Sequence, residues 1–285
     1  MNKGSYIILI LLLNSFVCCS QVNSKIQLIV RGDDMGFSHS GNEAIIKCFK
    51  EGIETSIEVI VPSPWFPEAV KLLIENPTVD VGIHIALTSE WDNMKYRPVS
   101  HCSSLTDDSG YFFPFIWPNK NYPGRALLES NWKIEEIEKE FRAQIELALK
   151  KIPRISHISA HMGCYDMSPE VKALAKKLAI EYGIDIDPIE LGVIDIGYQG
   201  SSKTTEDKKR SFIAMLERLE PGKTHLFVDH PGLDTPELRG IHHKGYENVA
   251  LDRQGVTDVW TDPDVKEVIR KRDIRLISYR EIKRK

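Results

Sequence analysis

Cysteine is scarce in this sequence and offers no structural framework. The 285 residues include five, Cys18, Cys19, Cys48, Cys102 and Cys164, of which the first two fall within an apolar N-terminal stretch. The other three are odd in number and far apart, so they predict neither a disulfide framework nor a CxxC metal site. Cys48 occupies an apolar position of a helical pattern, which predicts a buried thiol.

An excess of basic charge is also missing. Lys and Arg number 37 against 41 Asp and Glu, which gives a formal net charge of -4. Proteins that bind nucleic acid usually carry a basic face, so we expect no nucleic-acid partner. The sequence also lacks a glycine-rich or basic phosphate cradle, and this absence argues against a phosphoesterase.

The apolar run at the N-terminus is too short to span a membrane, which takes about 20 residues. It extends from Tyr6 to Leu13, follows a single Lys and precedes small residues, a pattern typical of an export signal. We therefore expect residues 1–20 to be a signal peptide, either cleaved after Ser20 or of the lipoprotein type with a lipid on Cys19 or Cys18. An uncleaved anchor is a third alternative.

The expected location follows from this signal. We expect an exported protein in the periplasm, or a lipoprotein of the outer membrane or cell surface. Contact with a membrane is expected only through such an N-terminal lipid, because the remaining sequence contains no apolar run of the required length.

Short β-branched runs alternate with helical patterns along the rest of the chain, which predicts one α/β domain over 25–285. Strands are expected at 26–30, 55–61, 79–87, 154–161, 183–187, 192–198, 223–230 and 273–279. Helices are expected at 41–52, 65–77, 134–151, 168–183, 205–219 and 262–272. Residues 88–130 form a long irregular connection of the kind that often serves as a substrate loop, and 236–255 is a second candidate loop. Seven or eight βα units fit a barrel or an open doubly wound sheet.

Polar residues at the ends of strands favour the barrel. Asp33-Asp34, His84, His161 and His230 each lie at or just past the carboxyl end of an expected strand. In a parallel barrel these ends converge on the face that carries the active site. One Asp with two His is a common ligand set for a divalent metal, and a second carboxylate there can act as a base toward bound water. Two His favour Zn²⁺, whereas Mg²⁺ would suit a shell richer in oxygen.

The adjacent aspartates pose a geometric question. Successive strand residues point to opposite faces, so Asp33 and Asp34 cannot both reach one centre from a regular strand. We expect Gly32 and Gly36 on either side to let the chain bend. A metal ion would also remove the repulsion between the two carboxylates, because its charge dominates the local field.

Four stretches together resemble the YdjC-like carbohydrate deacetylases, the family of the ChbG-type chitooligosaccharide deacetylases. They are "IVRGDDMGFSHSGNEAI" (29–45), "VGIHIALT" (81–88), "ISHISAHMG" (155–163) and "FVDHPG" (227–232). Their order and spacing agree with the family from about residue 25 to 283. The resemblance implies a distorted (β/α) barrel related to NodB-type polysaccharide deacetylases. It also implies metal-dependent removal of acetyl groups from amino sugars or their oligosaccharides.

The resemblance also implies roles for the matching residues. Asp34, His84 and His161 would bind the metal, Asp33 would activate water as the base, and His230 would protonate the leaving amine. The third motif departs from its usual form, because Ser159 stands where an Asp is usual and Gly163 where a His is usual. In the first motif Met35 replaces a Phe.

Other residues are candidates for supporting roles. His157 lies on the same strand face as Ser159 and His161, so His157 or Ser159 could contact a metal ligand on the side away from the metal. His157 could instead be an alternative metal ligand or a structural histidine. Trp91 and Trp117 could stack on sugar rings or pack their loops. Arg253 could touch substrate, although pairing with Asp258 is the simpler expectation.

Two expectations remain for the surroundings and the activity. Asp229 should point away from its neighbour His230 on a regular strand, so no dyad is expected. The alternatives to an N-deacetylase are an O-acetyl esterase acting on polysaccharide and a glycan-binding lipoprotein that has lost catalysis. The departures at Ser159 and Gly163 motivate the second alternative.

Overall fold

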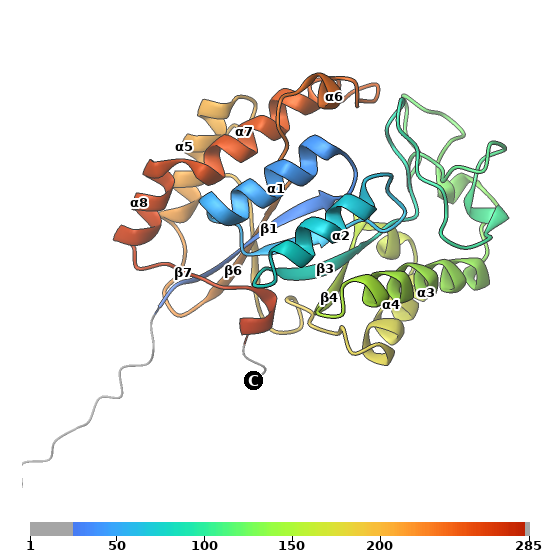
Figure 1. Cartoon of the computed structure of the whole chain (residues 1–285), viewed down its shortest axis with the longest axis horizontal. Coiled ribbons are helices and arrows are strands. Elements are labelled where there is room, and N and C mark those ends of the chain that lie inside the picture. The colour runs from blue at the N-terminus through green and yellow to red at the C-terminus, as the bar shows by residue number, and fades with distance from the viewer. Residues whose placement is uncertain (1–24, 283–285) are drawn as a thin grey trace, which may run out of the picture.

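The computed structural model describes residues 25–282, and they form one parallel sheet with helices packed around it (Figure 1). The predicted signal peptide at 1–20, with Cys18 and Cys19, lies outside the described residues. The strands are β1 Gln27–Met35, β2 Ser56–Val59, β3 Asp80–Ile85, β4 His157–Ala160, β5 Ile194–Ile196, β6 Thr224–Asp229 and β7 Arg275–Leu276. All the strand pairs are parallel.

The sheet curls into an incomplete barrel, which confirms the predicted distorted (β/α) barrel. Its strand order is β4-β3-β2-β1-β6-β5, and β7 lies beside β1 off this path. The two partners on that edge of β1 divide its length: Gln27 and Leu28 pair with β7, whereas Arg31 and the residues after it pair with β2. Within 25–282 no hydrogen-bonded strand pair joins β4 to β5, so the barrel is open there.

The helices flank the sheet, with α1 and α2 in front of it in Figure 1. Their bounds are α1 His39–Glu51, α2 Phe66–Glu75, α3 Ile134–Lys151, α4 Pro169–Glu181, α5 Thr205–Leu216, α6 Pro236–Arg239, α7 Val249–Thr261 and α8 Pro263–Lys271. Side-chain oxygens of Ser38, Ser168, Thr204 and Asp262 accept hydrogen bonds from the first turns of α1, α4, α5 and α8. These caps begin four of the predicted helices; α4, α5 and α8 begin within one residue of the expected position, and α1 begins two residues before it. Cys48 is fully buried on α1, as predicted.

Two predicted elements are wrong. The strand expected at 183–187 is absent, because Gly183 ends α4 with a φ of 68° and the chain then turns. Oδ1 of Asp187 accepts hydrogen bonds from the backbone of Ile189 and Glu190, a local turn that competes with strand pairing.

The candidate loop at 236–255 instead contains α6 and the start of α7. The α7 sequence is rich in Val, Thr and Gly, which are poor helix formers. Packing provides its stability, because Val256 and Trp260 are fully buried against the helices beside them. Gly255 permits the approach of α5, since a Cβ there would lie 3.0 Å from Oγ1 of Thr205.

The long connection at 88–130 is irregular, as predicted, and it lies at the right of Figure 1 in green. It contains only two short 3-10 turns, Ser103–Leu105 and Leu127–Glu129. Leu105, Phe112 and Ile116 anchor it, because their side chains are buried in the main core. This segment therefore covers the carboxyl ends of the strands on the side of β3 and β4.

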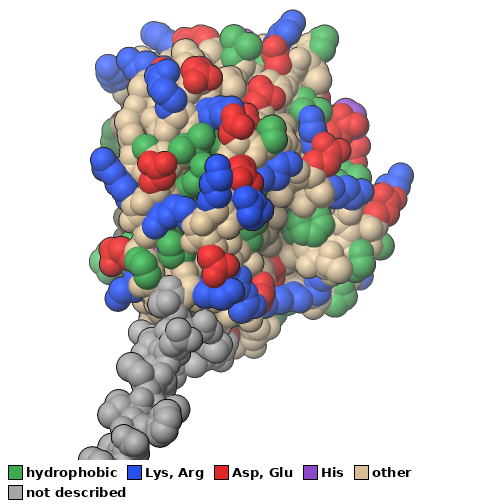
Figure 2. Space-filling model, turned by 90° about the vertical axis from the view of Figure 1, so that its left-hand side faces the viewer, with side chains coloured by type: hydrophobic (Ala, Val, Ile, Leu, Met, Phe, Trp, Pro, Cys, Tyr) green, Lys and Arg blue, Asp and Glu red, His purple; other side chains and the backbone are tan. Residues whose placement is uncertain are grey.

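The surface carries both signs of charge. On the face shown in Figure 2, blue Lys and Arg side chains alternate with red Asp and Glu, and apolar side chains appear singly or in small groups. Among residues 25–282 no helix is long and apolar enough to cross a membrane.

A candidate metal centre at the carboxyl ends of the strands

The end of β1 departs from a regular strand at the paired aspartates. The register with β2 shifts between Gly32 and Met35, and Asp34 has a φ of 71°. A bulge of this kind redirects the side chains that follow it, and aspartate tolerates the left-handed conformation better than most residues. As a result Oδ2 of Asp33 and Oδ1 of Asp34 lie 3.6 and 3.5 Å from the same atom, Nε2 of His84.

Gly32 and Gly36, on either side of the aspartates, are glycine for different structural reasons. Gly36 has a φ of 104° and turns the chain after the pair, as predicted. Gly32 does not lie in the left-handed region, so the expectation that it bends the chain is wrong. A Cβ at Gly32 would lie 2.1 Å from Oε1 of Glu54, and glycine is required there for this close approach. The bend itself is at Asp34.

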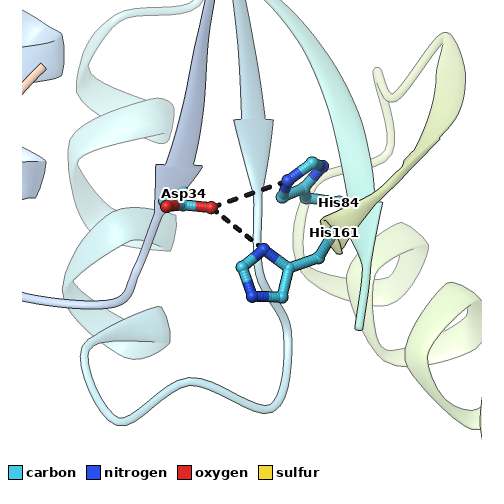
Figure 3. A group of neighbouring side chains, drawn as sticks. All are labelled: Asp34, His84 and His161. Atoms are coloured by element: carbon cyan, nitrogen blue, oxygen red, sulfur yellow. Dashed lines mark ion pairs between the residues drawn. The ribbon is translucent and has the colours of Figure 1, made fainter. Parts of the chain in front are cut away.

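Asp34, His84 and His161 converge as the sequence predicted (Figure 3). All three are buried, and Oδ1 of Asp34 lies 3.5 Å from Nε2 of His84 and 3.2 Å from Nδ1 of His161. One ligand atom from each residue lies within 4.8 Å of the others. Oδ1 of Asp34 has no hydrogen-bond partner among the described residues, and a buried carboxylate oxygen normally has one. Two imidazole nitrogens and this free oxygen suit Zn²⁺.

The charges around these three residues also suit a divalent cation. Six buried or nearly buried charged groups face the centre or its ligands: Asp33, Asp34, Glu58, Glu90, Arg31 and Arg253. Counted as ionised, the four carboxylates and two guanidinium groups sum to a charge of -2. Buried charge of one sign is costly unless it is compensated, so with both histidine ligands neutral the residues fit a cation of charge +2.

The same surroundings shift the pKa values of the ligands. Burial lowers the pKa of His84, which leaves a neutral ring able to coordinate a metal. Burial also opposes a charge on His161, but Glu90 and Asp34 outweigh it and raise the pKa to about 10. The pKa of Asp34 lies well below its usual range, because Arg253 and the neighbouring histidines outweigh the effect of burial. In the protein without a cation, a protonated His161 therefore adds a second positive charge beside Asp34, at 3.2 Å, to that of Arg253 at 2.7 Å.

Asp33 is held by Arg31, a residue that the sequence analysis missed. Nε and Nη2 of Arg31 donate to the two carboxylate oxygens at 2.8 and 2.9 Å, the bidentate geometry that fixes a carboxylate most firmly. Nη1 of Arg31 also donates to the hydroxyl of Tyr279 at 2.9 Å. Arg31 and Asp33 are two apart on a strand and share a face, so the spacing was a usable signal.

His230 lies at the rim of the centre, with its side chain 40% exposed. Its Nε2 is 3.9 Å from Oδ2 of Asp34. Asp229 does not point away from it, contrary to expectation: Oδ1 of Asp229 lies 3.5 Å from Nδ1 of His230 and accepts a hydrogen bond from its backbone N–H. The strand ends at Asp229, so strict alternation no longer applies. Burial opposes a charge on His230, but Asp34 and Asp229 outweigh it and raise its pKa.

Arg253 contacts the centre directly, so the expected pairing with Asp258 is wrong. Its Nη2 donates to Oδ2 of Asp34 at 2.7 Å, and both side chains are at most 4% exposed. The guanidinium lies over the rings of Phe37 and Trp91, 4.4 and 5.4 Å from their centroids. Asp258 instead accepts from Gln254, one turn earlier on α7.

The two residues proposed to support the ligands lie on β4. Nδ1 of His84 is 2.7 Å from Oγ of Ser159, so Ser159 touches a ligand from behind. His157 does not join the metal-facing atoms: its Nε2 lies 2.5 Å from Oε1 of Glu58, and its ring stacks on Tyr279 with centroids 3.7 Å apart. This placement agrees with the structural alternative for His157.

The two candidate tryptophans differ in exposure. Trp91 is 2% exposed and packs on Phe37 and Arg253, so it supports Arg253 and presents no open face to a sugar. Trp117 is 46% exposed, and its indole lies 3.1 Å from a Cβ built at Gly163, just after His161. Of the two, only Trp117 has an exposed ring next to the centre.

Comparisons with known proteins agree on the family. The family model described as YdjC-like protein matches residues 27–271. A carbohydrate deacetylase of Geobacillus stearothermophilus is 28% identical over 263 residues, which cover 89% of this chain and 96% of that protein. A carbohydrate deacetylase of Listeria monocytogenes serotype 4b is 32% identical over 268 residues, which cover 90% and 100%.

A solved structure shares the fold. A protein of Enterococcus faecalis V583, described as a candidate cellobiose-phosphate cleavage protein, superposes with a TM-score of 0.70 and 24% identity. The match covers 92% of this chain and 100% of that one. Its likeness supports the incomplete barrel independently of the strand pairing given above.

Proposed function

The chain belongs to the YdjC-like protein family, and from this premise we propose that it is a metal-dependent hydrolase that removes acetyl groups from N-acetylated amino sugars or oligosaccharides. The observation that carries the proposal is the convergence of Asp34, His84 and His161 beside a second carboxylate, Asp33. The names of the related carbohydrate deacetylases support the reaction and the class of substrate.

Asp34, His84 and His161 would hold one divalent metal, and two imidazole ligands favour Zn²⁺ over Mg²⁺. When bound, the metal supplies Lewis-acid polarisation and lowers the pKa of a bound water. The side chains around it exclude bulk water, because all three ligands are buried.

Asp33 is the proposed base that takes a proton from the attacking water. Its Oδ2 is the carboxylate oxygen at 3.6 Å from Nε2 of His84, beside the proposed metal position. The bidentate contact with Arg31 fixes the carboxylate in place. Asp33 thus receives a proton without having to reorient.

His230 is the proposed acid that donates a proton to the leaving nitrogen. Its partly exposed ring borders the centre, with Nε2 3.9 Å from Oδ2 of Asp34. Asp34 and Asp229 raise its pKa, so a larger share of His230 carries the proton that the amine requires. Asp33 and His230 thus have the separate roles of base and acid in the proposed reaction.

Trp117 is the proposed contact for the sugar ring. Its indole is exposed and lies beside Gly163, two residues after the proposed ligand His161. The missing side chain at Gly163 leaves room for the indole at this position. An acetylated amino sugar or oligosaccharide is therefore the partner that the surroundings of the centre suit.

A substrate panel tests the proposal. Protein loaded with Zn²⁺ is incubated with N-acetylated and O-acetylated sugars of several lengths, and released acetate is measured. Release from N-acetylated sugars supports the proposal, and release from O-acetylated sugars alone supports the esterase alternative. Metal binding without acetate release from any sugar would favour a glycan-binding protein.

Two variants test the assigned roles. Asp33→Asn and His230→Ala should each lower kcat by about 100- to 10,000-fold, the usual contribution of a general base or acid, while Zn²⁺ remains bound. An ester leaves more readily than an amine, so His230→Ala should slow an amide substrate more than an ester. Near-normal deacetylation by either variant would contradict the assignment.

For the location we propose export through residues 1–20, with or without a lipid on Cys19 or Cys18. The support is the pattern of one Lys, a short apolar run and small residues. Cell fractionation with N-terminal sequencing distinguishes a cleaved soluble protein from a lipidated one. A full-length protein recovered in the cytoplasm would contradict export.

A further inference from the structure

Each side chain that faces the proposed metal also has a polar partner on its far side. Oδ2 of Asp34 accepts from Arg253 at 2.7 Å. Nε2 of His161 lies 3.1 Å from Oε2 of Glu90, which leaves Nδ1 for the metal. These partners are charged groups in direct contact with the ligand, and such partners commonly set ring orientation and tautomer at metal sites.

His84 differs from the other two ligands because its partner is a neutral hydroxyl. Nδ1 of His84 lies 2.7 Å from Oγ of Ser159. The same hydroxyl donates to Oε2 of Glu58 at 2.6 Å. Ser159 and Glu58 are 5% and 0% exposed, so water does not compete for either hydrogen bond. A buried carboxylate therefore stands behind His84, one residue further away than Glu90 stands behind His161.

The direction of these hydrogen bonds follows from the donors available. A serine hydroxyl has one hydrogen, and a carboxylate can only accept. If the hydrogen of Ser159 points to Glu58, the lone pair of Ser159 must accept from Nδ1–H of His84. Nε2 then carries the lone pair, and it is Nε2 that lies 3.5 Å from Oδ1 of Asp34 in the metal-facing group. The chain of contacts thus selects the tautomer that metal binding needs.

Glu58 can contact Ser159 across β3, because β3 has a glycine where the Glu58 side chain passes over it. Strand β3 lies between β2 and β4, so Glu58 must reach across it to contact Ser159. It crosses at Gly82, which pairs with Glu58 on one side and with His157 on the other. A Cβ at Gly82 would lie 2.4 Å from Oε2 of Glu58 and 2.4 Å from Nε2 of His157. Glycine at 82 therefore provides the passage that this contact requires.

We propose that Glu58, acting through the hydroxyl of Ser159, is the positioning carboxylate that orients His84 and fixes its tautomer for metal binding. The inference rests on the proposed metal centre. It also accounts for Ser159 at the position where the usual motif has Asp. The negative charge is retained but comes from β2, two strands away from β4. The serine relays this charge, so its presence does not signal a lost activity.

The test is the affinity for Zn²⁺, measured by competition with a chromogenic chelator. Ser159→Ala removes the link and leaves the Glu58–His157 pair intact. Glu58→Gln keeps an oxygen that can accept from Ser159 but removes the charge. Each variant should bind Zn²⁺ about 10- to 100-fold more weakly than the parent protein, the usual effect of losing such a partner.

Glu140→Gln is the matched control, because Glu140 is a fully buried carboxylate whose hydrogen-bond partners, such as Ser100 and Gln144, lie away from the centre. It should bind Zn²⁺ as the parent does. Circular dichroism monitors folding in every variant. If Glu58→Gln fails to fold because His157 loses its partner, Ser159→Ala decides the question by itself.

A rescue variant separates positioning from structural support. The double variant E58Q/S159D places a carboxylate in direct contact with Nδ1 of His84, and it should recover most of the lost Zn²⁺ affinity. Nitrogen NMR of the His84 ring provides a second readout, since loss of the link should mix the two tautomers in the metal-free protein.

The outcomes are separable from those of the proposed function. A parent protein that binds no Zn²⁺ would contradict the metal centre itself. A parent that binds Zn²⁺, with Ser159→Ala and Glu58→Gln within about twofold of it, would overturn this inference alone. Failure of the double variant to regain affinity would also overturn it, because a carboxylate behind His84 would then not be what the metal site requires.

Discussion

Arg253 and a bound cation would share the carboxylate of Asp34, and this competition can be measured. The perturbation is Arg253→Met, which keeps an apolar side chain against Phe37 and Trp91 but removes the charge. In the wild-type protein Arg253 donates to Asp34 at 2.7 Å, while its Nε and Nη1 have no hydrogen-bond partner among the described residues. The variant therefore removes one buried ion pair and little other hydrogen bonding.

The size of the effect follows from burial. Both partners are at most 4% exposed, and removal of one member of a buried pair typically costs about 3–5 kcal/mol, because the other charge is left uncompensated. A bound cation would compensate Asp34 in place of Arg253. Against this gain stands the loss of an orienting partner, about 1.4–2.7 kcal/mol for a 10- to 100-fold effect. The difference of the midpoints is about 2 kcal/mol, so Arg253→Met should bind Zn²⁺ roughly thirtyfold more tightly.

The assay is urea unfolding of wild type and Arg253→Met, once with a chelator and once with saturating Zn²⁺. The variant should lose about 3–5 kcal/mol of unfolding free energy with the chelator, and about 2 kcal/mol less than that with Zn²⁺. Arg142→Met is the control, since Arg142 pairs with Glu138 and Glu181 on the surface. It should cost less than about 1 kcal/mol in both conditions.

Two results would refute the reasoning. The first is an equal loss of stability with and without Zn²⁺, which would mean that Arg253 and the cation do not share Asp34. The second is weaker Zn²⁺ binding by Arg253→Met. The expected sign is opposite to that for Glu58→Gln, because the guanidinium is a cation that competes with the metal and the Glu58 carboxylate is an anion that favours it.

Three further predictions concern pH and substrate. Burial, with a contribution from Asp33, raises the pKa of Glu54 well above its usual 4.5. The unfolding free energy should therefore fall by about 1.4 kcal/mol for each pH unit between the pKa of Glu54 in the unfolded chain and its higher pKa in the folded protein. Glu54→Gln should abolish that slope in urea titrations between about pH 5 and 7, and an unchanged slope would contradict this account. Glu90 and Asp34 outweigh burial and raise the pKa of His161 to about 10, so a metal ion must displace the proton of His161. Below that pH the Zn²⁺ affinity should rise about tenfold per pH unit. An affinity that does not change between about pH 6.5 and 8.5 would show that His161 carries no proton for the metal to displace. Trp117→Ala should raise KM for an acetylated oligosaccharide about tenfold with little change in kcat, and an unchanged KM would remove Trp117 from the sugar contact.

The sequence predicted which polar residues lie at the carboxyl ends of the strands, because periodicity and polarity are local properties, although β1 extends to Met35 and not only to residue 30. Asp34, His84 and His161 converge as expected, since parallel strands in one sheet bring their carboxyl ends to one edge. Helix 134–151 matches its predicted bounds, because a regular apolar stripe and its flanking charges lie within one segment.

What the sequence did not predict depends on contacts between distant segments. Helix α7 contains several poor helix formers, and its packing against α1 and α5 stabilises it. Arg253 on this helix was assigned to the wrong carboxylate, because its actual partner Asp34 is distant in the sequence. The bend at Asp34 was assigned to Gly32 and Gly36, because a glycine beside a turn usually supplies the flexibility, and Gly32 does not take part in it. Gly32 instead accommodates Glu54, which approaches from the segment before β2.

The paired aspartates illustrate why a local pattern can identify a centre without explaining it. In a regular strand Asp33 and Asp34 would face apart, and the bulge with φ 71° at Asp34 brings them to one point. Each carboxylate then needs a positively charged side chain beside it, because an unpaired buried carboxylate is costly. Arg31 supplies one from two residues away, and Arg253 supplies the other from 219 residues away. With Glu58 and Glu90 behind the histidines, the carboxylates outnumber the guanidinium groups by two, and in the metal-free protein a protonated His161 offsets one of these charges. A divalent cation that replaced the proton of His161 would balance the remaining charge of the centre.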